Sequence, residues 1–133
     1  MDSKNSKQLN QVDIGKMRVK KENHEKAVEI FADMLKYQHS HPELFYYSRT
    51  RSFYMDAPDN PDEEIWMFID EYDNREKYWN ALLSSTKDNP VLLEKLQKCF
   101  SVMSPPATHL VQHEVWTEIK ELRIVFKDRL LDE

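Results

Sequence analysis

The sequence contains a single glycine, Gly15, among its 133 residues. Loops that bind nucleotide phosphates need several glycines, because glycine lets backbone N–H groups approach the phosphate closely. The nucleophile elbow of α/β-hydrolases needs a pair of glycines, in the pattern Gly-x-Ser-x-Gly. The shortage of glycine therefore excludes a nucleotide loop of either common kind and a hydrolase elbow.

Cysteine is equally scarce, and Cys99 is the only one. A lone cysteine excludes an intramolecular disulfide and a Cys-x-x-Cys zinc or redox pair. No apolar run approaches the roughly 18 residues that a transmembrane helix needs, and residues 1–11 lack the apolar segment of a secretory signal. We therefore expect a cytoplasmic protein, in a reducing compartment, without a membrane partner.

The charge balance is acidic, with 24 acidic and 19 basic residues and a net charge of -5. An acidic surface argues against nucleic acid as a partner. Hydrophobic residues make up 40% of the chain and aromatic residues 11%, which is typical of a folded domain rather than a disordered one. Composition therefore indicates an ordinary globular protein.

Hydrophobic periodicity predicts an α+β domain over residues 12–119. Strand patterns cover residues 12–19, 44–55, 64–72 and 108–119, and helical patterns cover 23–39 and 90–103, with a further short helix from Asn74. The order β-α-β-β-α-β is that of a ferredoxin-like fold with an antiparallel sheet. We expect residues 1–11 to be a flexible N-terminal segment. Residues 120–133 fit either a helix or a continued strand.

Side-chain patterns within these elements give finer predictions. Apolar residues change parity around Gly15, which is typical of a β-bulge. Tyr47 and Arg49 fall on one face of their predicted strand, and Trp66 and Tyr72 share a face of the next strand. The buried stripe of the 90–103 helix is expected to contain Leu92, Leu93, Leu96, Phe100 and Met103.

Three stretches resemble the antibiotic-biosynthesis-monooxygenase group of dimeric α/β-barrel proteins. One is the strand Met17-Arg18-Val19-Lys20 followed by the amphipathic helix to Leu35, and another is His41-Pro42-Glu43-Leu44 leading into an aromatic strand. The most specific is Glu71-Tyr72-Asp73-Asn74-Arg75-Glu76-Lys77-Tyr78-Trp79. The resemblance implies a ferredoxin-like protomer whose sheet pairs with that of a second copy, which makes the chain its own partner in a homodimer.

The resemblance does not extend to the members that degrade haem. Those members use an asparagine on the first strand, a tryptophan at the end of the third strand and a histidine on the second helix. Here Gly15 and Tyr72 stand at the two strand positions, and residues 74–104 contain no histidine. Haem degradation by that set of residues is therefore not expected.

For function, the resemblance implies a monooxygenase that needs no cofactor and acts on an aromatic or quinol-like small molecule. Such an enzyme needs an apolar slot, a base and a donor for the oxyanion. We expect Arg49 to stabilise the oxyanion and His113 to act as the base. The aromatic side chains expected to bind the ligand are Trp66, Tyr72, Tyr47 and Trp116.

A second interpretation stays open from the residues alone. Large aromatic side chains dominate ordinary cores and interfaces, and no acid–base pair is brought together by its spacing. His109 and His113 lie about 13 Å apart if both are on one strand, too far to chelate one metal, so no metal site is expected. The alternative function is a non-catalytic protein that binds a small molecule or assembles with itself.

Overall fold

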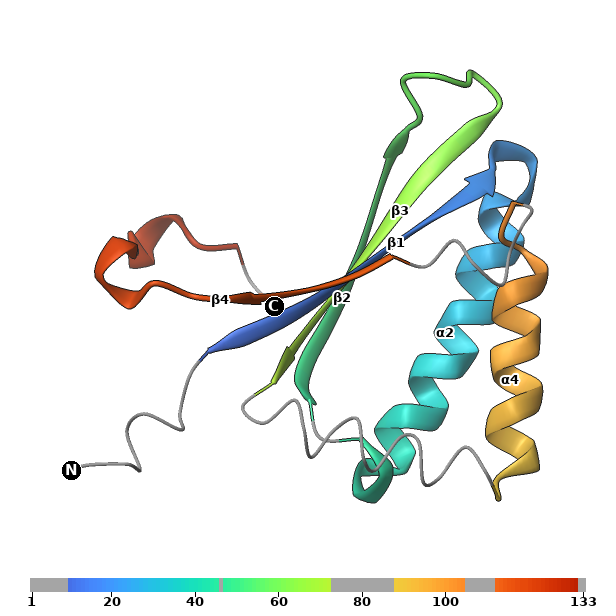
Figure 1. Ribbon diagram of the computed structural model, residues 1–133, viewed down its shortest axis with the longest axis horizontal. Helices are drawn as coiled ribbons and strands as arrows, with labels where there is room; N and C mark the ends of the chain where they lie inside the picture. Colours follow the sequence, from blue (N-terminus) through green and yellow to red (C-terminus); the bar gives the residue numbers. More distant parts are fainter. Residues whose placement is uncertain (1–9, 46, 73–87, 105–111, 132–133) are drawn as a thin grey trace.

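The computed structural model describes residues 10–45, 47–72, 88–104 and 112–131. The main elements follow the predicted order β-α-β-β-α-β (Figure 1). They are β1 (Gln11–Lys20), α2 (His24–Ser40), β2 (Tyr47–Asp56), β3 (Glu63–Tyr72), α4 (Pro90–Ser101) and β4 (Gln112–Thr117). The short helix predicted from Asn74 lies outside the described residues.

The four strands form one antiparallel sheet in the order β2-β3-β1-β4. Both helices lie on the same side of this sheet, and the segment that follows β4 lies on the other side (Figure 1). We call the helix-covered side the inner face and the opposite side the outer face. The α+β, ferredoxin-like architecture predicted from the sequence is therefore confirmed.

The predicted bulge at Gly15 is wrong. The register between β1 and β3 runs without a shift from Gln11 opposite Tyr72 to Lys20 opposite Glu63. The apparent change of parity arises because β1 is apolar on both faces. Met17 and Val19 are buried under the helices on the inner face, which also carries Asp13 and Gly15. Val12 and Ile14 lie at the alternate positions and therefore on the outer face.

The irregularity of the sheet lies instead in β2, between Tyr47 and Arg49. The shift in register moves these two residues to opposite faces. Tyr47 pairs with Tyr72 and packs in the inner core, whereas Arg49 pairs with Glu71 on the outer face. The prediction that Tyr47 and Arg49 share a face is therefore wrong, because a bulge reverses the alternation of side chains.

The helices begin close to their predicted positions but are capped differently. Asn89 caps α4, because its side chain accepts a hydrogen bond of 3.0 Å from the backbone N–H of Leu92. Pro90 then occupies the first turn, where its missing N–H costs nothing. Asn23 precedes α2 but makes no side-chain capping bond, since a 3₁₀ turn over Lys21–Asn23 leads into the helix.

The core between the helices and the inner face contains two clusters of buried side chains. One joins the strands to α2 and to the end of α4, and contains Met17, Val19, Ala27, Trp66, Val102 and Met103. The other lies between the two helices and contains Met34, Phe45, Leu92 and Cys99. Burial raises the pKa of the Cys99 thiol to about 11, so this cysteine is a packing residue at neutral pH.

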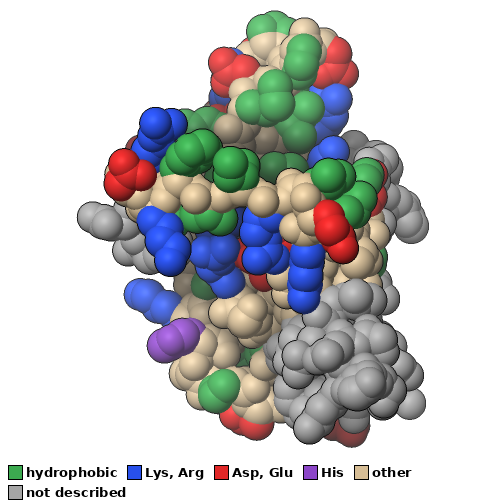
Figure 2. Space-filling view, turned by 90° about the vertical axis from the view of Figure 1, so that its left-hand side faces the viewer, with side chains coloured by type: hydrophobic (Ala, Val, Ile, Leu, Met, Phe, Trp, Pro, Cys, Tyr) green, Lys and Arg blue, Asp and Glu red, His purple; other side chains and the backbone are tan. Residues whose placement is uncertain are grey.

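The outer face carries apolar side chains that no part of the described chain covers. Exposed and half-buried hydrophobic residues from all four strands lie on this face. Figure 2 shows hydrophobic side chains interspersed with Lys and Arg on this side of the molecule. The apolar residues are Val12, Ile14, Phe53, Met55, Ile65, Met67, Ile69 and Trp116. The sheet therefore has two apolar faces, of which the helices cover one.

The C-terminal segment forms neither the helix nor the continued strand considered above. Residues 118–131 contain 3₁₀ turns at Lys120–Leu122 and Lys127–Arg129, separated by extended backbone. Among the described residues, no helix is long and apolar enough to cross a membrane.

A pair of adjacent leucines in α4 tests the core. Leu92 is 1% exposed, whereas Leu93, predicted to be buried, is 39% exposed. Leu92→Ala should lower the free energy of unfolding by about 2–5 kcal/mol, because it leaves a cavity between the helices. Leu93→Ala is the matched control and should cost less than about 1 kcal/mol. Urea denaturation measures both, and equal effects would contradict the packing described here.

Candidate functional site

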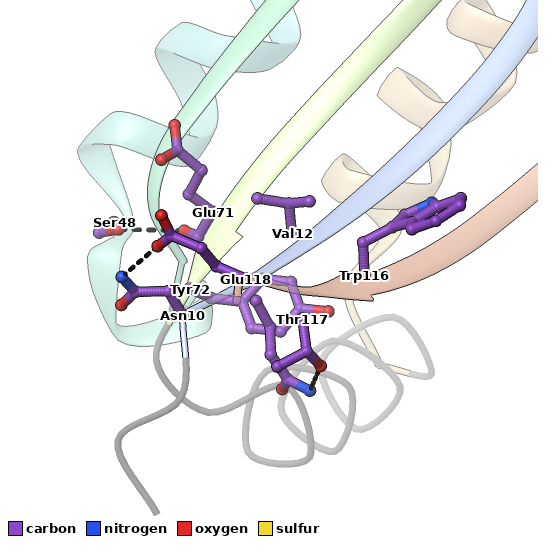
Figure 3. Close-up of a pocket in the computed structure, with 9 residues that line it drawn as sticks. Asn10, Val12, Ser48, Glu71, Tyr72, Trp116, Thr117 and Glu118 are labelled. Atoms are coloured by element: carbon purple, nitrogen blue, oxygen red, sulfur yellow. Dashed lines mark hydrogen bonds between the residues drawn. The ribbon is translucent and has the colours of Figure 1, made fainter. Parts of the chain in front are cut away.

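A pocket of about 480 Å³ lies where β1 begins and β3 and β4 end. It combines aromatic, amide, hydroxyl and carboxylate side chains (Figure 3). The lining residues are Asn10, Gln11, Val12, Ser48, Glu71, Tyr72, Trp116, Thr117 and Glu118. Its volume is in the range of small-molecule sites, so the pocket is the candidate functional site.

The register of the sheet brings these residues together. Val12 of β1 lies opposite Glu71 of β3 on one side and opposite Trp116 of β4 on the other. Gln11 likewise lies between Tyr72 and Thr117. Because neighbouring residues of a strand point to opposite faces, the pocket wraps around the end of the sheet and includes side chains from both faces.

Glu71 is held in place by Arg49, the residue that we expected to stabilise an oxyanion. The Arg49 Nε donates to Glu71 Oε2 at 2.6 Å, and a second guanidinium nitrogen donates to Oε1 at 3.1 Å. This two-point contact lowers the pKa of Glu71, with a smaller contribution from Arg51. Glu71 is therefore ionised at neutral pH and neutralises the charge of Arg49.

Glu118 is a second fixed carboxylate at the pocket. Asn10 donates to its Oε1 at 2.9 Å, and the Arg123 Nε donates to its Oε2 at 2.6 Å. The hydrogen bond from Arg123, followed by that from Asn10, lowers the pKa of Glu118 to about 2. Both pocket carboxylates therefore accept hydrogen bonds at neutral pH but are weak proton acceptors.

The aromatic residues predicted to bind a ligand do not all lie at the same site. Tyr72 and Trp116 both line the pocket, Tyr72 as a buried residue and Trp116 as a largely exposed one. Tyr47 lies opposite Tyr72 in the inner core, where burial and the nearby charge of Asp70 raise the pKa of its hydroxyl. Two of the predicted residues thus line one pocket, and a third lies beside Tyr72 on the neighbouring strand.

Trp66 shares the inner face with Tyr72, as predicted, but lies at the other end of β3. The two residues are six positions apart, which is about 20 Å along a strand. Trp66 is 5% exposed, packs against Phe31 and donates its indole N–H to Glu64 at 2.9 Å. Its position is therefore that of a core residue.

His113 lies in β4 opposite Gly15, on the strand that also carries Trp116. The side chain of His113 lies outside the part of the chain whose side chains the structure describes. Its role as a base is therefore still a prediction.

A polar cluster at the opposite end of the sheet was missed in the sequence. The side chain of Glu64 is 8% exposed, and its Oε1 contacts His24 Nδ1 at 2.8 Å as well as the indole N–H of Trp66. The ring of His24 also packs edge-on against Tyr54 at 4.6 Å. The sequence does contain a signal for this cluster, because Glu64 lies on the same predicted strand face as Trp66 and Phe68. A carboxylate among apolar residues on a buried face needs hydrogen-bond partners.

The residues of the pocket that sequence reasoning missed are polar ones at strand ends. Asn10, Thr117 and Glu118 carry no recognisable motif. They come together only through the pairing of β1 with β4, where the Glu118 N–H donates to the Asn10 carbonyl at 2.9 Å. Contacts across more than a hundred positions of sequence leave no short-range pattern.

The carboxylate of Glu118 offers a test of the pocket geometry. Its folded-state pKa lies below the ordinary value of 4.5, so its contacts stabilise the fold above that value and are lost as the pH falls toward about 2. Arg123→Gln should return the pKa toward 4.5, because it removes the larger of the two causes. An NMR titration of the side-chain carboxyl measures this, and an unchanged pKa would contradict the Arg123 contact.

Comparison with known proteins gives structural matches only. A scan against protein-family models and a search of curated protein sequences find no match. The structure matches SnoaB, a cofactor-independent oxygenase from Streptomyces nogalater, with a TM-score of 0.50 and 11% identity over 85% of this chain and 97% of the other. A single-residue mutant of SnoaB matches with a TM-score of 0.51 and 12% identity, over 82% and 92%.

A further match is a conserved protein from Methanosarcina mazei Go1, with a TM-score of 0.50 and 11% identity over 85% of this chain and 96% of the other. Identities this low show a shared fold. The order of elements, the strand order and the helices on one face of the sheet agree with the fold that the sequence resemblance implied. The chain therefore has the fold of the cofactor-independent oxygenase SnoaB.

Proposed function

We propose that this protein is a cofactor-independent monooxygenase that acts on an aromatic or quinol-like small molecule in the pocket at the end of β3. The observation that carries this proposal is the combination of Tyr72 and Trp116 with two ionised carboxylates around about 480 Å³. Aromatic walls suit a flat ring, and carboxylates that accept hydrogen bonds suit its hydroxyl groups. The fold shared with SnoaB supports the same reaction class.

The chemistry requires an electron-rich substrate. A phenol that loses a proton becomes a phenolate and an anthrone becomes a carbanion, and the electron-rich carbon of either anion reduces molecular oxygen directly. Oxidation of a methylene group to a carbonyl places one oxygen atom in the product and releases the other as water, with all electrons supplied by the substrate. The protein has only to bind the ring, accept the proton and stabilise the negative charge.

We assign the roles in the proposed reaction as follows. Tyr72 on the inner face and Trp116 on the outer face contact the ring where the pocket wraps around the end of the sheet, and Tyr47 lies beside Tyr72 on the inner face. Glu71 and Glu118 accept hydrogen bonds from ligand hydroxyls, while their low pKa values leave the base role to His113. Arg49 reaches the pocket through Glu71 and does not line it, so its proposed role as the oxyanion donor requires it to give up part of its hydrogen bonding to Glu71.

The uncovered outer face supports a homodimer. A sheet with apolar side chains on both faces needs two coverings, and α2 and α4 supply one. A second copy presents the same apolar face and satisfies both sheets at once. Val12, Glu71 and Trp116 belong both to this face and to the pocket, so the partner would lie beside the bound ligand.

One observation favours the non-catalytic alternative. Arg49 and Arg123 hold the described carboxylates of the pocket in their ionised form, and each arginine is itself neutralised by that contact. An arrangement of this kind binds hydroxyl groups without requiring a proton acceptor. A protein that binds an aromatic molecule without oxidising it is therefore the second candidate function.

Oxygen consumption separates the two functions. An oxygen electrode with a panel of anthrones and quinols should detect uptake, and Trp116→Ala should lower kcat/KM roughly fivefold, the value of an aromatic contact of about 1 kcal/mol. Tyr54→Ala is the matched control, because Tyr54 is 59% exposed and Trp116 is 57% exposed, but Tyr54 lies away from the pocket. Ligand binding without oxygen uptake would favour the second function. The absence of both binding and uptake would contradict the assignment of the pocket as a functional site.

A further inference from the structure

The pocket at the end of β3 offers a ligand mainly hydrogen-bond acceptors, because several of its donors are used within the protein. The side-chain nitrogen of Asn10 donates to the Glu118 carboxylate at 2.9 Å (Figure 3), and that of Gln11 donates to the Thr117 hydroxyl at 3.1 Å. The Ser48 hydroxyl donates to a backbone carbonyl of β3 at 3.1 Å. These contacts leave the amide oxygens of Asn10 and Gln11 as acceptors for a ligand.

Among the residues that the structure describes, the two pocket carboxylates also keep acceptor positions open. An ionised carboxylate can accept about four hydrogen bonds. Glu71 accepts two from Arg49, and Glu118 accepts from Arg123 and Asn10. The side chains of Glu71 and Glu118 are 29% and 35% exposed, so their remaining lone pairs lie within reach of a ligand.

The charge around the pocket favours a neutral ligand. None of the described lining residues is basic, so no positively charged donor lines the pocket. The balancing charges lie outside the lining: Arg49 and Arg51 contact Glu71, and Arg123 contacts Glu118. Three arginines therefore face two carboxylates, and a cationic ligand would gain little from such a site. The chemical complement of the pocket is a neutral molecule that donates hydrogen bonds.

We infer that the pocket selects the reduced, hydroxyl-bearing form of an aromatic ligand against the oxidised, carbonyl-bearing form. This inference rests on the ligand class proposed above and specifies its redox state. A hydroxyl group donates to the acceptors of the pocket. A carbonyl oxygen can only accept, so it would displace water from the carboxylates without replacing the lost hydrogen bonds. Sites built for a hydroxyl donor discriminate strongly against analogues that lack it.

This preference has a consequence for the proposed reaction. Oxidation of a methylene group to a carbonyl adds an acceptor to the ligand, so the product should bind more weakly than the substrate. Tyr72 and Trp116 offer ring surfaces, which contact the aromatic part of either form equally well. The polar groups of the pocket would therefore favour binding of the substrate and release of the product.

Isothermal titration calorimetry under nitrogen tests the preference with the full chain. The probes are naphthohydroquinone, its oxidised form naphthoquinone, and the dimethyl ether of naphthohydroquinone, which keeps both oxygens but donates no hydrogen bond. Naphthohydroquinone should bind about tenfold or more tightly than the other two, which is the lower end of what a hydrogen bond to a charged acceptor contributes. Similar dissociation constants for the three probes would overturn the inference, and this comparison needs no variant.

Glu118→Gln tests whether the preference arises in the pocket. The amide is uncharged and carries a donor, so this variant should lower the preference for naphthohydroquinone by about threefold or more. Glu63→Gln is the matched control, because Glu63 also contacts an arginine, Arg18 at 3.3 Å, but lies at the opposite end of β3. The control should keep the preference of the unmodified chain, and an equal preference in both variants would contradict the assignment to the pocket.

The outcomes also separate this inference from the proposed function. Oxygen uptake together with equal binding of the three probes would overturn the redox preference and leave the monooxygenase proposal intact. Preferential binding of naphthohydroquinone without oxygen uptake would support the inference in a binding protein. Tighter binding of naphthylmethylammonium, a cation of similar size, would overturn the inference in favour of selection by charge. If none of the probes binds, the inference and the pocket assignment both fail.

Discussion

The structure depends on the pairing of β1 with β3 at the centre of the sheet. These two strands are apolar on both faces, and their register runs without interruption over ten residue pairs. The helices cover the inner face through Met17, Val19 and Trp66. The same pairing places Val12, Ile14 and Met67 on the outer face. Folding of one chain therefore creates an apolar surface that neither helix covers.

The pocket that we propose as the functional site lies at the end of this sheet. The strands of a small sheet end together, which places side chains from both faces within reach of one pocket. Arginine then fixes the charge of each carboxylate there, through Arg49 for Glu71 and Arg123 for Glu118. Such paired groups are well suited to orienting a ligand, and because both carboxylates are ionised and weakly basic, the proposed reaction needs another side chain as its base.

The architecture could be predicted because hydrophobic periodicity within short segments indicates each helix and strand. The resulting β-α-β-β-α-β order then indicates the fold. The predictions that failed depended on exact geometry. Alternating apolar residues at Gly15 fit either a bulge or a two-faced strand, and only the register decides between them. Tyr47 and Arg49 were placed together because the true bulge between them has no sequence marker of its own. The pocket was half predictable, since Tyr72 and Trp116 are prominent aromatics, whereas Glu118 reaches it through long-range pairing.

The buried contact between Glu64, His24 and Trp66 has a spectroscopic consequence. The indole N–H of Trp66 is bonded to a carboxylate, and its ring lies 5.6 Å from that of His24, the first residue of α2. An indole in such a site senses the electric field of the carboxylate that accepts its hydrogen bond. Trp66 is therefore an intrinsic fluorescent reporter of how the start of α2 is docked on the sheet, and the protein carries this reporter without any label.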